Sequence, residues 1–488
     1  MIQRFLFVAA LALLTEPARV AQAQTFAPVA LYATGANSSP SGIAAGDING
    51  DGYPDLVTTY FTSNNIAVLL NQKDGTFGAP VTYVADAAGF ATPLGVTLSD
   101  FNKDGYSDIV ASSEVSGSVS VLLNKKDGTF AAAVTYSTEA SSFPQFLAAG
   151  DVNGDGYPDI VTANFYTDDI GVLLNKKDGT FTSVALYPTG KSTLPTGLAL
   201  GDVNKDGYPD IVTTLLSGSA AVLLNKKDGT FGPSVAYPAG ANSSLVGVAV
   251  GDVDKDGYPD IVTADNVGNA DVLLNKKDGT FKAGTAYPAG PKSAPYGVVL
   301  GDMNGDGYPD IITANEDDGT ASVLLNKQNG TFATALVLST SGRAAAGQQQ
   351  PYNVAVSDVN KDGKLDIVAA NAGDNTVGVL LNRTATLATQ PAAAGQPQAT
   401  VFPNPASAAE GSTLLASSLP AEVRSLEATL LNSLGQVVAH TTLAVAQGQG
   451  RAALPTTGLP SGSYLVRIAT HTDHGDPTLL PLQRLVVR

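Results

Sequence analysis

Seven copies of one acidic loop recur along this chain, and they constrain its fold more than any other feature. The loop reads Asp-x-Asn-x-Asp-Gly-x-x-Asp, with Asp in place of Asn in the fifth copy. The first aspartates of successive copies lie 53, 51, 51, 50, 50 and 56 residues apart. A single copy would be an ordinary polar turn, but seven copies in one register indicate a structural unit repeated seven times.

Each unit predicts four short β-strands. Short apolar segments flank the loop, as in residues 42–46 and 55–60, and the first of them is poor in bulky side chains. A third strand ends in Leu-Leu-Asn, and a lysine-rich turn then leads through Thr-Phe into a fourth strand. Four strands in about fifty residues match one propeller blade, so we predict an all-β, seven-bladed β-propeller of four-stranded blades over residues 24–384. The first strands, with their small side chains, would line its central channel.

The ends of the repeat array predict how the ring closes. The seventh unit stops at Asn382, after its third strand. Residues 25–32, Thr-Phe-Ala-Pro-Val-Ala-Leu-Tyr, match the fourth strand at residues 230–237, Thr-Phe-Gly-Pro-Ser-Val-Ala-Tyr. Residues 25–32 should therefore supply the outer strand of blade seven, whose other strands come from residues 353–382, and so hide the open edges.

The loops carry oxygen donors at the spacing of a calcium loop. Side chains are available at positions 1, 3, 5 and 9, and the glycine at position 6 permits a turn that points the carbonyl of position 7 inward. The predicted ligands are, by position, Asp47, Asp100, Asp151, Asp202, Asp252, Asp302 and Asp358; Asn49, Asn102, Asn153, Asn204, Asp254, Asn304 and Asn360; Asp51, Asp104, Asp155, Asp206, Asp256, Asp306 and Asp362; the carbonyls of Tyr53, Tyr106, Tyr157, Tyr208, Tyr258, Tyr308 and Lys364; and Asp55, Asp108, Asp159, Asp210, Asp260, Asp310 and Asp366.

Hard oxygen ligands without nearby Cys or His favour Ca²⁺ over zinc or a redox metal, and up to seven ions are expected. An EF-hand is excluded, because position 12 is Thr58 in the first copy and both flanks read as strands. The alternative is acidic turns without an ion. Against it, the loops hold 22 of the 44 acidic residues, and seven Ca²⁺ would reduce the formal charge of −17 to about −3. The scarcity of arginine in the ring excludes nucleic acid as a partner.

At this point the chain resembles a known family, the FG-GAP or VCBS repeat of integrin α subunits and many bacterial surface proteins. Residues 77–80 read Phe-Gly-Ala-Pro, and the calcium motif matches all seven units. The resemblance implies a seven-bladed propeller, bound calcium and extracellular recognition. It does not identify a ligand, because a shared fold does not establish a shared function.

The ends of the chain predict its location. Residues 1–23 have the pattern of a signal peptide, with Arg4, a ten-residue apolar stretch and Ala-Gln-Ala before the cleavage point. No later segment is apolar enough to span a membrane. The chain has no cysteine, so calcium and ring closure rather than disulfides would stabilise it. Residues 385–400, rich in Ala, Thr, Gln and Pro, read as a linker.

Residues 401–488 lack acidic loops and show short alternating strands. The segments 401–405, 431–437, 459–465 and 485–488 resemble, in order, the C-terminal sorting domain of the type IX secretion system. That resemblance implies a small Ig-like β-sandwich that interacts with the secretion machinery, and a protein secreted from, or attached to the outer surface of, a bacterium with an outer membrane. The alternative is a fibronectin-like spacer.

Two functions from different classes remain open, together with a passive scaffold. The first is a monomeric calcium-binding module for recognition or adhesion, with an extracellular glycan or protein as ligand. The second is a secreted carbohydrate-active enzyme, a lyase or hydrolase. The ring has no Cys or His and shows no catalytic motif, so we expect no enzyme activity.

The connections between strands predict where a ligand binds. In an up-and-down blade the acidic loop and the lysine turn share one face, while the 2-to-3 and 4-to-1 connections share the other. The first face repeats in every unit and the second varies, and variable loops on a rigid frame are where recognition is usually built. The candidate ligand-face residues are Tyr60, Phe61, Phe165, Tyr166, Asp168, Asp169, Glu316, Tyr296 and Tyr352.

Overall fold

The computed structural model describes residues 24–87, 89, 91–240, 243–291, 293–341 and 351–384 of the repeat region. In the C-terminal region it describes residues 398–407, 411–417, 419, 423–431, 437–446, 449–454, 456, 459, 462–472, 475–479 and 483–487. The predicted signal peptide and residues 385–397 of the predicted linker lie outside these ranges. The chain divides into two compact units, Met1–Thr384 and Ala385–Arg488.

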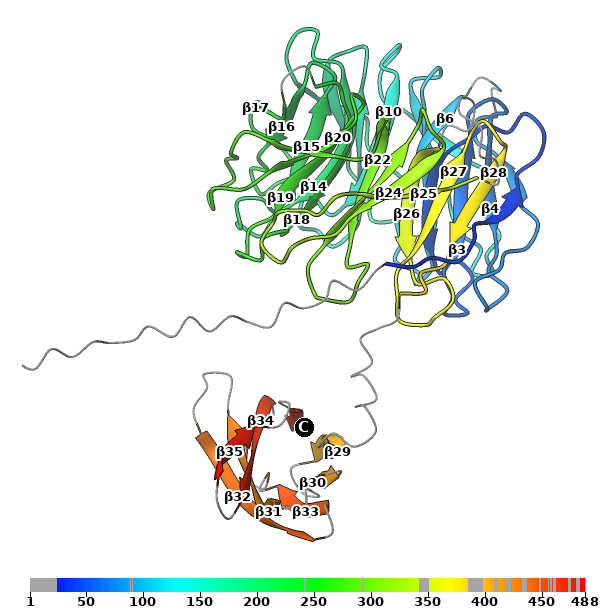
Figure 1. Ribbon diagram of the computed structural model, residues 1–488. Helices are drawn as coiled ribbons and strands as arrows, with labels where there is room; N and C mark the ends of the chain where they lie inside the picture. The colour runs from blue at the N-terminus through cyan, green and yellow to red at the C-terminus, as the bar shows by residue number, and fades with distance from the viewer. Residues whose placement is uncertain are drawn as a thin grey trace, which may run out of the picture. The chain divides into compact units, whose positions relative to one another are not determined.

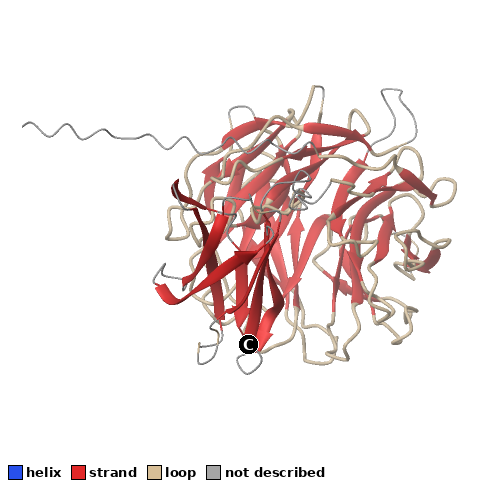
Figure 2. Cartoon of the chain, turned by 60° about the horizontal axis from the view of Figure 1, so that its bottom comes forward, coloured by secondary structure: helices blue, strands red, loops and turns tan. Residues whose placement is uncertain are grey.

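Strands, turns and loops account for all the described residues, without a helix (Figure 1, Figure 2). Consequently, no helix in the described part of the chain could cross a membrane. The prediction of an all-β propeller is confirmed by seven antiparallel four-stranded sheets in the first unit.

The blades take their strands in chain order. Blades one to three are β2 (Pro40–Gly46), β3 (Asp55–Tyr60), β4 (Asn65–Leu69), β5 (Val81–Val84); β6 (Pro93–Ser99), β7 (Asp108–Ser113), β8 (Ser118–Leu122), β9 (Val134–Ser137); and β10 (Pro144–Gly150), β11 (Asp159–Asn164), β12 (Asp169–Leu173), β13 (Ala185–Pro188). Blades four to six are β14 (Pro195–Gly201), β15 (Asp210–Leu215), β16 (Ser219–Leu223), β17 (Val235–Pro238); β18 (Leu245–Gly251), β19 (Asp260–Asp265), β20 (Asn269–Leu273), β21 (Thr285–Pro288); and β22 (Pro295–Gly301), β23 (Asp310–Asn315), β24 (Thr320–Leu324), β25 (Leu336–Ser339).

Blade seven combines both ends of the unit. Its strands are β26 (Pro351–Ser357), β27 (Asp366–Asn371), β28 (Thr376–Leu380) and the N-terminal β1 (Ala30–Ala33). β1 pairs antiparallel with β28, and a separate bridge joins Phe26 to Asn382. The N-terminal segment therefore occupies the outer edge of the last blade, with its regular pairing shifted toward the end of the predicted 25–32 segment.

The first strand of each blade lies innermost, because it contacts the first strands of both neighbouring blades around a closed cycle from β2 to β26. These contacts are close. A Cβ on Gly42 would lie 2.2 Å from the Leu94 carbonyl oxygen of the next blade, and one on Gly197 would lie 2.3 Å from that of Val246. Glycine is required at these two positions because any side chain would collide with the neighbouring backbone.

Apolar contacts between adjacent blades make the core. One cluster joins Leu56 and Phe77 of blade one to Val368 and Val379 of blade seven, and the other blades meet in the same way. The phenylalanine of each lysine turn packs edge-on against a tyrosine of the preceding blade, with ring centroids 5.3–5.4 Å apart in six pairs: Tyr32–Phe77, Tyr83–Phe130, Tyr136–Phe181, Tyr187–Phe231, Tyr237–Phe281 and Tyr287–Phe332. These phenylalanines are buried core residues.

The asparagine that ends Leu-Leu-Asn joins each blade to the one before it. In blade four, Asn225 Nδ2 donates to the carbonyl oxygens of Pro209 in its own blade and Val152 in blade three, at 2.9 and 2.8 Å. All seven blades repeat the cross-blade bond, and in blade one Asn71 donates to Val359 of blade seven. The cross-blade hydrogen bond thus recurs between all neighbouring blades, including blades seven and one, where the ring closes.

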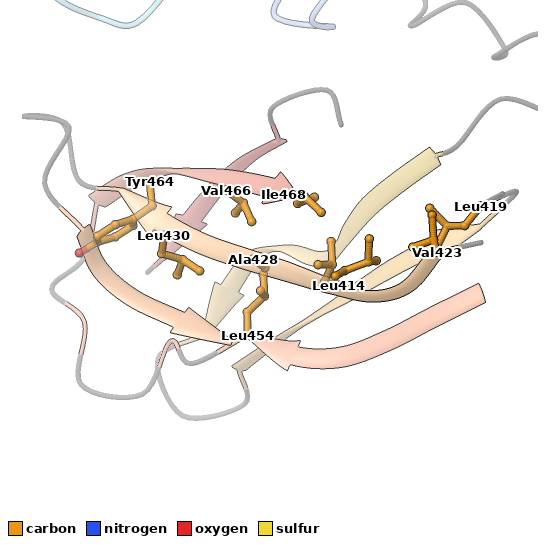
Figure 3. Packing of buried hydrophobic residues seen from close by; sticks show 10 residues of the cluster. Leu414, Leu419, Val423, Ala428, Leu430, Leu454, Tyr464, Val466 and Ile468 are labelled. Carbon is orange, nitrogen blue, oxygen red and sulfur yellow. The ribbon is translucent and has the colours of Figure 1, made fainter. Parts of the chain in front are cut away.

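The second unit contains two sheets that share strands. One consists of β29 (Gln398–Ser407), β30 (Gly411–Ser417), β33 (Gln449–Leu454) and the end of β32 (Val437–Ala446). The other pairs β31 (Val423–Leu431) with β32 and β34 (Gly462–Thr472), and β34 with β35 (Gly475–Leu479) and β36 (Gln483–Val487). β29 and β32 belong to both sheets. Leu414 and Leu454 of one sheet pack with Leu430 and Val466 of the other in a buried cluster (Figure 3).

Candidate metal loops and ligand face

The acidic loops are organised by hydrogen bonds to their own backbone. In blade one, Asp47 Oδ1 accepts from the N–H of Gly50 at 2.8 Å, and Asp47 Oδ2 accepts from the N–H of Gly52 at 2.8 Å. Asp51 Oδ1 accepts from the N–H of Tyr53 at 2.9 Å. Gly50 and Gly52 have φ angles of +75° and +88°, so both positions 4 and 6 are left-handed. The loop is held in a tight turn with its carboxylates inside.

The aspartate at position 9 is the buried side chain of each loop. Asp55 is fully buried at the start of β3. Its Oδ2 accepts from the N–H of Ile48 at 3.1 Å, and its Oδ1 accepts from the N–H of Asn71 at 2.7 Å. Burial raises the pKa of Asp260 and Asp310, its counterparts in blades five and six, to about 7, with a further contribution from the neighbouring loop aspartates. Such a group gains stability from a nearby cation.

The donor set fits calcium. In blade five, one carboxylate oxygen from each of Asp252, Asp254 and Asp260 lies within 4.8 Å of the others. Each remaining loop replaces the middle aspartate by asparagine, which also offers an oxygen. Carboxylate and amide oxygens grouped in this way, with a glycine-dependent turn, suit a hard divalent ion.

The fifth-position carboxylate faces a lysine from the same blade's turn. The Asp256 Oδ2–Lys277 Nζ distance is 3.4 Å, and four other blades have equivalent pairs at 3.6–3.7 Å. These lysine side chains are 55–60% exposed, so the pairs are weak and leave the carboxylate available to an ion. In blade seven, Lys364 at position 7 pairs with Asp362 at 3.6 Å. The acidic loop and lysine turn of a blade therefore share one face.

Six of the seven loops also contact the turn of the next blade. A Cβ on Gly128, in the turn of blade two, would lie 3.0 Å from Asn49 Cβ in the loop of blade one. The same approach recurs between Gly229 and Asn153 and between Gly330 and Asp254, at 2.9 and 2.8 Å. Because the turn glycine touches position 3, a change in one loop acts directly on its neighbour.

Blade three presents an aromatic group on the opposite face. Tyr166 is 60% exposed. Its ring centroid lies 4.6 Å from that of Phe143 and 5.0 Å from that of Phe165. The 2-to-3 connection of this blade is bonded to the preceding 4-to-1 connection, since the N–H of Phe165 donates to the Phe143 carbonyl at 3.1 Å. Two variable connections thus form one aromatic surface, which we call the blade-three platform (Phe143, Phe165 and Tyr166).

Three of the predicted ligand-face residues are buried in the ring or hydrogen-bonded to it. Tyr60 is only 3% exposed, and burial raises its pKa to about 12. Asp169 is 7% exposed and accepts from Asn164 Nδ2 at 2.8 Å. Asp168 accepts from the backbone N–H groups of residues 192–194 at 2.7–2.9 Å and so holds the next connection. Burial removes Tyr60 and Asp169 from a ligand's reach, whereas the half-buried Asp168 stays a predicted ligand-face residue. Phe61 is half-buried.

Predicted residues from blades six and seven meet at the inner strands. Tyr296 and Tyr352 lie on β22 and β26, with ring centroids 5.0 Å apart, and Phe146 on β10 lies 6.0 Å from Tyr296. Burial, followed by the charges of Glu114 and Glu316, raises the pKa of Tyr296. We call these five residues the channel-mouth cluster. Burial also raises the pKa of Glu114 to about 7 and that of the half-buried Glu316.

Glu114 and Phe146 were missed in the sequence. Glu114 directly follows the second strand of its blade, as Glu316 does, and this shared position was the available signal. Phe146 occupies the inner-strand position that is glycine in five other blades. A cavity of about 390 Å³ along the inner strands is lined by Phe146 and by glycines such as Gly95, Gly197 and Gly247.

Comparisons with known proteins agree with this architecture. A family model described as "FG-GAP-like repeat" matches residues 47–111, 100–162, 151–213, 215–263, 252–313 and 302–369. A second model, "Secretion system C-terminal sorting domain", matches residues 400–476. The tail is thus a secretion sorting domain, which indicates a protein secreted or displayed on the outer surface.

Similar proteins include integrin alpha-6 of Gallus gallus, 28% identical over 176 residues, and that of Homo sapiens, 29% identical over 167 residues. These matches cover 32% and 28% of this chain but only 16% and 14% of the integrins. A solved structure of BBS1N in complex with ARL6DN matches with a TM-score of 0.51 and 11% identity, over 75% of this chain and 98% of that one. This last likeness concerns the fold alone.

Proposed function

We propose, from the membership of this chain in the FG-GAP-like repeat family, that it is a calcium-binding recognition module that binds a glycan or a protein outside the cell. The observation that carries the proposal is the contrast between the two faces of the ring. One face repeats the same acidic loop and lysine turn, whereas the other differs between blades and carries the exposed blade-three platform. A repeated face serves stability, and a variable face serves recognition.

The blade-three platform favours a sugar ring as part of the ligand. An exposed tyrosine supported by two phenylalanines offers a flat apolar surface with a polar edge, which is the combination that pyranose rings pack against. The chain has no tryptophan, so Tyr166 is the largest ring available in this group. The channel-mouth cluster adds carboxylates and phenols to the same side of the blades.

Calcium in the loops would stabilise the frame that carries the variable face. The seven predicted ligand sets given above would each hold one ion, and the ion would relieve the repulsion among the converging carboxylates. Since six of the loops touch the next blade's turn, bound calcium would also fix the spacing between those blades. Its contribution is structural, through binding to the folded state alone.

The ligand proposal is tested with glycan and protein arrays probed with the full-length protein. For a ligand found there, Tyr166→Ala should weaken binding at least tenfold, because the exposed ring is lost. Lys176→Ala, an exposed change on the opposite face of the same blade, is the matched control. Loss of binding in the lysine variant but not in the tyrosine variant would show that the face is assigned backwards.

The calcium proposal is tested by thermal unfolding with and without a chelator. The melting temperature should fall markedly in chelator, because each ion stabilises the folded state by about RT ln(1 + [L]/Kd). Asp155→Ala should remove one ion per chain and leave the other sites. A melting curve that is the same in chelator would exclude a stabilising role for the loops.

An enzyme is the second candidate, and the channel-mouth cluster is the observation that favours it. Glu114 has a pKa raised to about 7 and lies near the phenols of Tyr296 and Tyr352. A carboxyl group of raised pKa near further acidic groups is suited to proton transfer. Incubation with polysaccharides found on the array, followed by assay of new reducing ends and unsaturated sugars, separates cleavage from binding. Product formation that Glu114→Gln abolishes would favour the enzyme.

A further inference from the structure

Blade five contains two buried aspartates far from its acidic loop. Asp265, the last residue of β19, is 1% exposed, and Asp271, in the middle of β20, is fully buried. Asp271 lies directly opposite Thr263 in the antiparallel pair, so Thr263, Asp265 and Asp271 share one side of the sheet. Blade five is the only blade with an acidic residue at either position. The counterparts of the two aspartates are Tyr60 and Ala67, Ser113 and Ser120, Asn164 and Gly171, Leu215 and Ala221, Asn315 and Ser322, and Asn371 and Gly378.

In blade six, the polar side chains at the corresponding positions are satisfied by hydrogen bonds. There, Asn315 Nδ2 donates to Ser322 Oγ at 2.7 Å, and Thr313 Oγ1 donates to Asn315 Oδ1 at 2.9 Å. In blade five the amide donor is replaced by the Asp265 carboxylate and the hydroxyl by the Asp271 carboxylate. Two acceptors therefore face each other where blade six has a donor and an acceptor.

This replacement leaves buried oxygens without partners. Among the described residues, neither carboxylate oxygen of Asp271 has a hydrogen-bond partner, and the same is true of Thr263 Oγ1 and Ser243 Oγ. Asp265 Oδ1 accepts from the N–H of Ser244 at 2.9 Å. Burial, and then the charge of Asp265, raises the pKa of Asp271 to about 7. An isolated buried carboxylate is very costly, so the pair needs either a bound cation or a proton to neutralise it.

The connection from the preceding blade lies beside the Asp271 carboxylate. A Cβ on Gly240 would lie 3.4 Å from Asp271 Oδ1 and 2.6 Å from Ser243 Oγ, which places the 4-to-1 connection from blade four against the carboxylate. In blades six and seven the carbonyl oxygens of Ala289 and Thr340, at the start of this connection, accept bonds from Ser322 and Asn371. The matching residue beside Asp271 is Ala239, so its carbonyl is a further oxygen at this place.

We propose that Asp265, Asp271, Thr263 and Ser243 bind a hard divalent cation, calcium, between blades four and five. The donors are all oxygens, and two carboxylates match the charge of one divalent ion. This site is separate from the acidic loop, because Asp260 and Asp265 stand at opposite ends of β19. An ion here would join two blades on the face of the ring that carries the variable connections.

The test replaces the pair by its counterpart from blade six. The double variant Asp265→Asn, Asp271→Ser reproduces the hydrogen-bonded Asn315–Ser322 arrangement and should fold without an ion. Calcium bound per full-length chain is measured by elemental analysis after dialysis against calcium-containing buffer. We expect the double variant to hold one ion fewer than the unchanged protein. An equal number in both would overturn the proposal and assign a shared proton to the pair.

Two further variants make the result independent of the loops and of folding defects. Asp155→Ala removes a loop ligand and shows whether the measurement resolves one ion. If Asp155→Ala leaves the number unchanged while the double variant lowers it, the loop proposal fails and the blade-five site stands. Asp271→Asn is a second test, in which a loss of one ion with unchanged gel-filtration behaviour is expected and an unchanged number contradicts the site.

Discussion

At the residue scale, the most consequential side chains are those that replace backbone pairing between blades. Asn225 satisfies two buried carbonyl oxygens, Pro209 in its own blade and Val152 in the preceding one, while its Oδ1 accepts from the N–H of Lys227 at 2.8 Å. The side chain thus ends a strand, shapes a turn and joins two blades. No apolar residue of similar size could do this, because the carbonyls would remain buried without donors.

Asn225→Ala should therefore lower the free energy of unfolding by about 1–3 kcal/mol, the cost of leaving buried acceptors unpaired. Urea unfolding of the calcium-loaded protein measures the change. Asn266→Ala, at an exposed position of blade five, is the control and should change it by about 0.5 kcal/mol or less. Equal effects in the two variants would mean that the cross-blade bond contributes nothing.

Glu114 predicts a pH dependence of stability. Burial raises its pKa from 4.5 to about 7 in the folded protein. Its contribution to stability is present below the ordinary pKa and is lost as the pH rises through about 7, because the folded state must then hold a buried carboxylate. Glu114→Gln, which stays neutral, should be more stable than the unchanged protein at pH 8, by up to about 3 kcal/mol. The difference should vanish near pH 4, and melting curves in saturating calcium measure it. A difference that is the same at both pH values would contradict this assignment.

At the element scale, the inner strands show how closely seven blades can approach a common axis. Each inner strand has a register shift after its first residues, as between Pro195 and Leu198 in β14. Gly197 within this bulge lies against the backbone of the next blade's inner strand. The bulge and the glycine together allow neighbouring backbones to touch.

Gly197→Ala should be strongly destabilising, by about 1–3 kcal/mol or more, because the added Cβ would lie 2.3 Å from the Val246 carbonyl oxygen. Gly232→Ala tests a glycine of the same blade whose nearest atom would be 3.5 Å away, and it should be tolerated. Thermal unfolding of both variants decides between them. If both melt alike, the inner strands can separate more easily than their contacts indicate.

At the scale of the whole molecule, the ring depends on one N-terminal strand. β1 gives β28 its outer partner, and the N–H of Ala27 donates to the Leu381 carbonyl at 2.8 Å. Phe26 packs into the cluster between blades six and seven. Without this segment, blade seven would present an unpaired edge, which is a site for association between chains.

Deletion of residues 24–33 should lower the melting temperature by several degrees and produce soluble oligomers, which calorimetry and light scattering would detect. Deletion of residues 401–488, which lie in the second unit, is the control for loss of a chain end. It should leave the melting of the ring unchanged and, because the tail is a sorting domain, retain the protein inside the cell envelope. A monomeric, equally stable N-terminal deletion would show that the ring closes without β1.

The sequence by itself determined the repeat, the strand order and the all-β class. These depend on residues close together in the chain: alternating apolar segments, the glycines of turns and the spacing of the acidic loop. The chemistry of the loops also lies within nine consecutive residues, so a calcium ligand set could be predicted from Asp47 to Asp55 without knowledge of the rest.

Only the tertiary structure decided which of the remaining side chains meet. Glu114 and Tyr296 interact electrostatically although they belong to blades two and six. Tyr60 was predicted to lie on the ligand face but is buried, and Asp265 and Asp271 become a pair only through the register of β19 and β20. The physical reason is that burial and the supply of hydrogen-bond donors depend on neighbouring strands and blades, and a local sequence pattern carries no information about either.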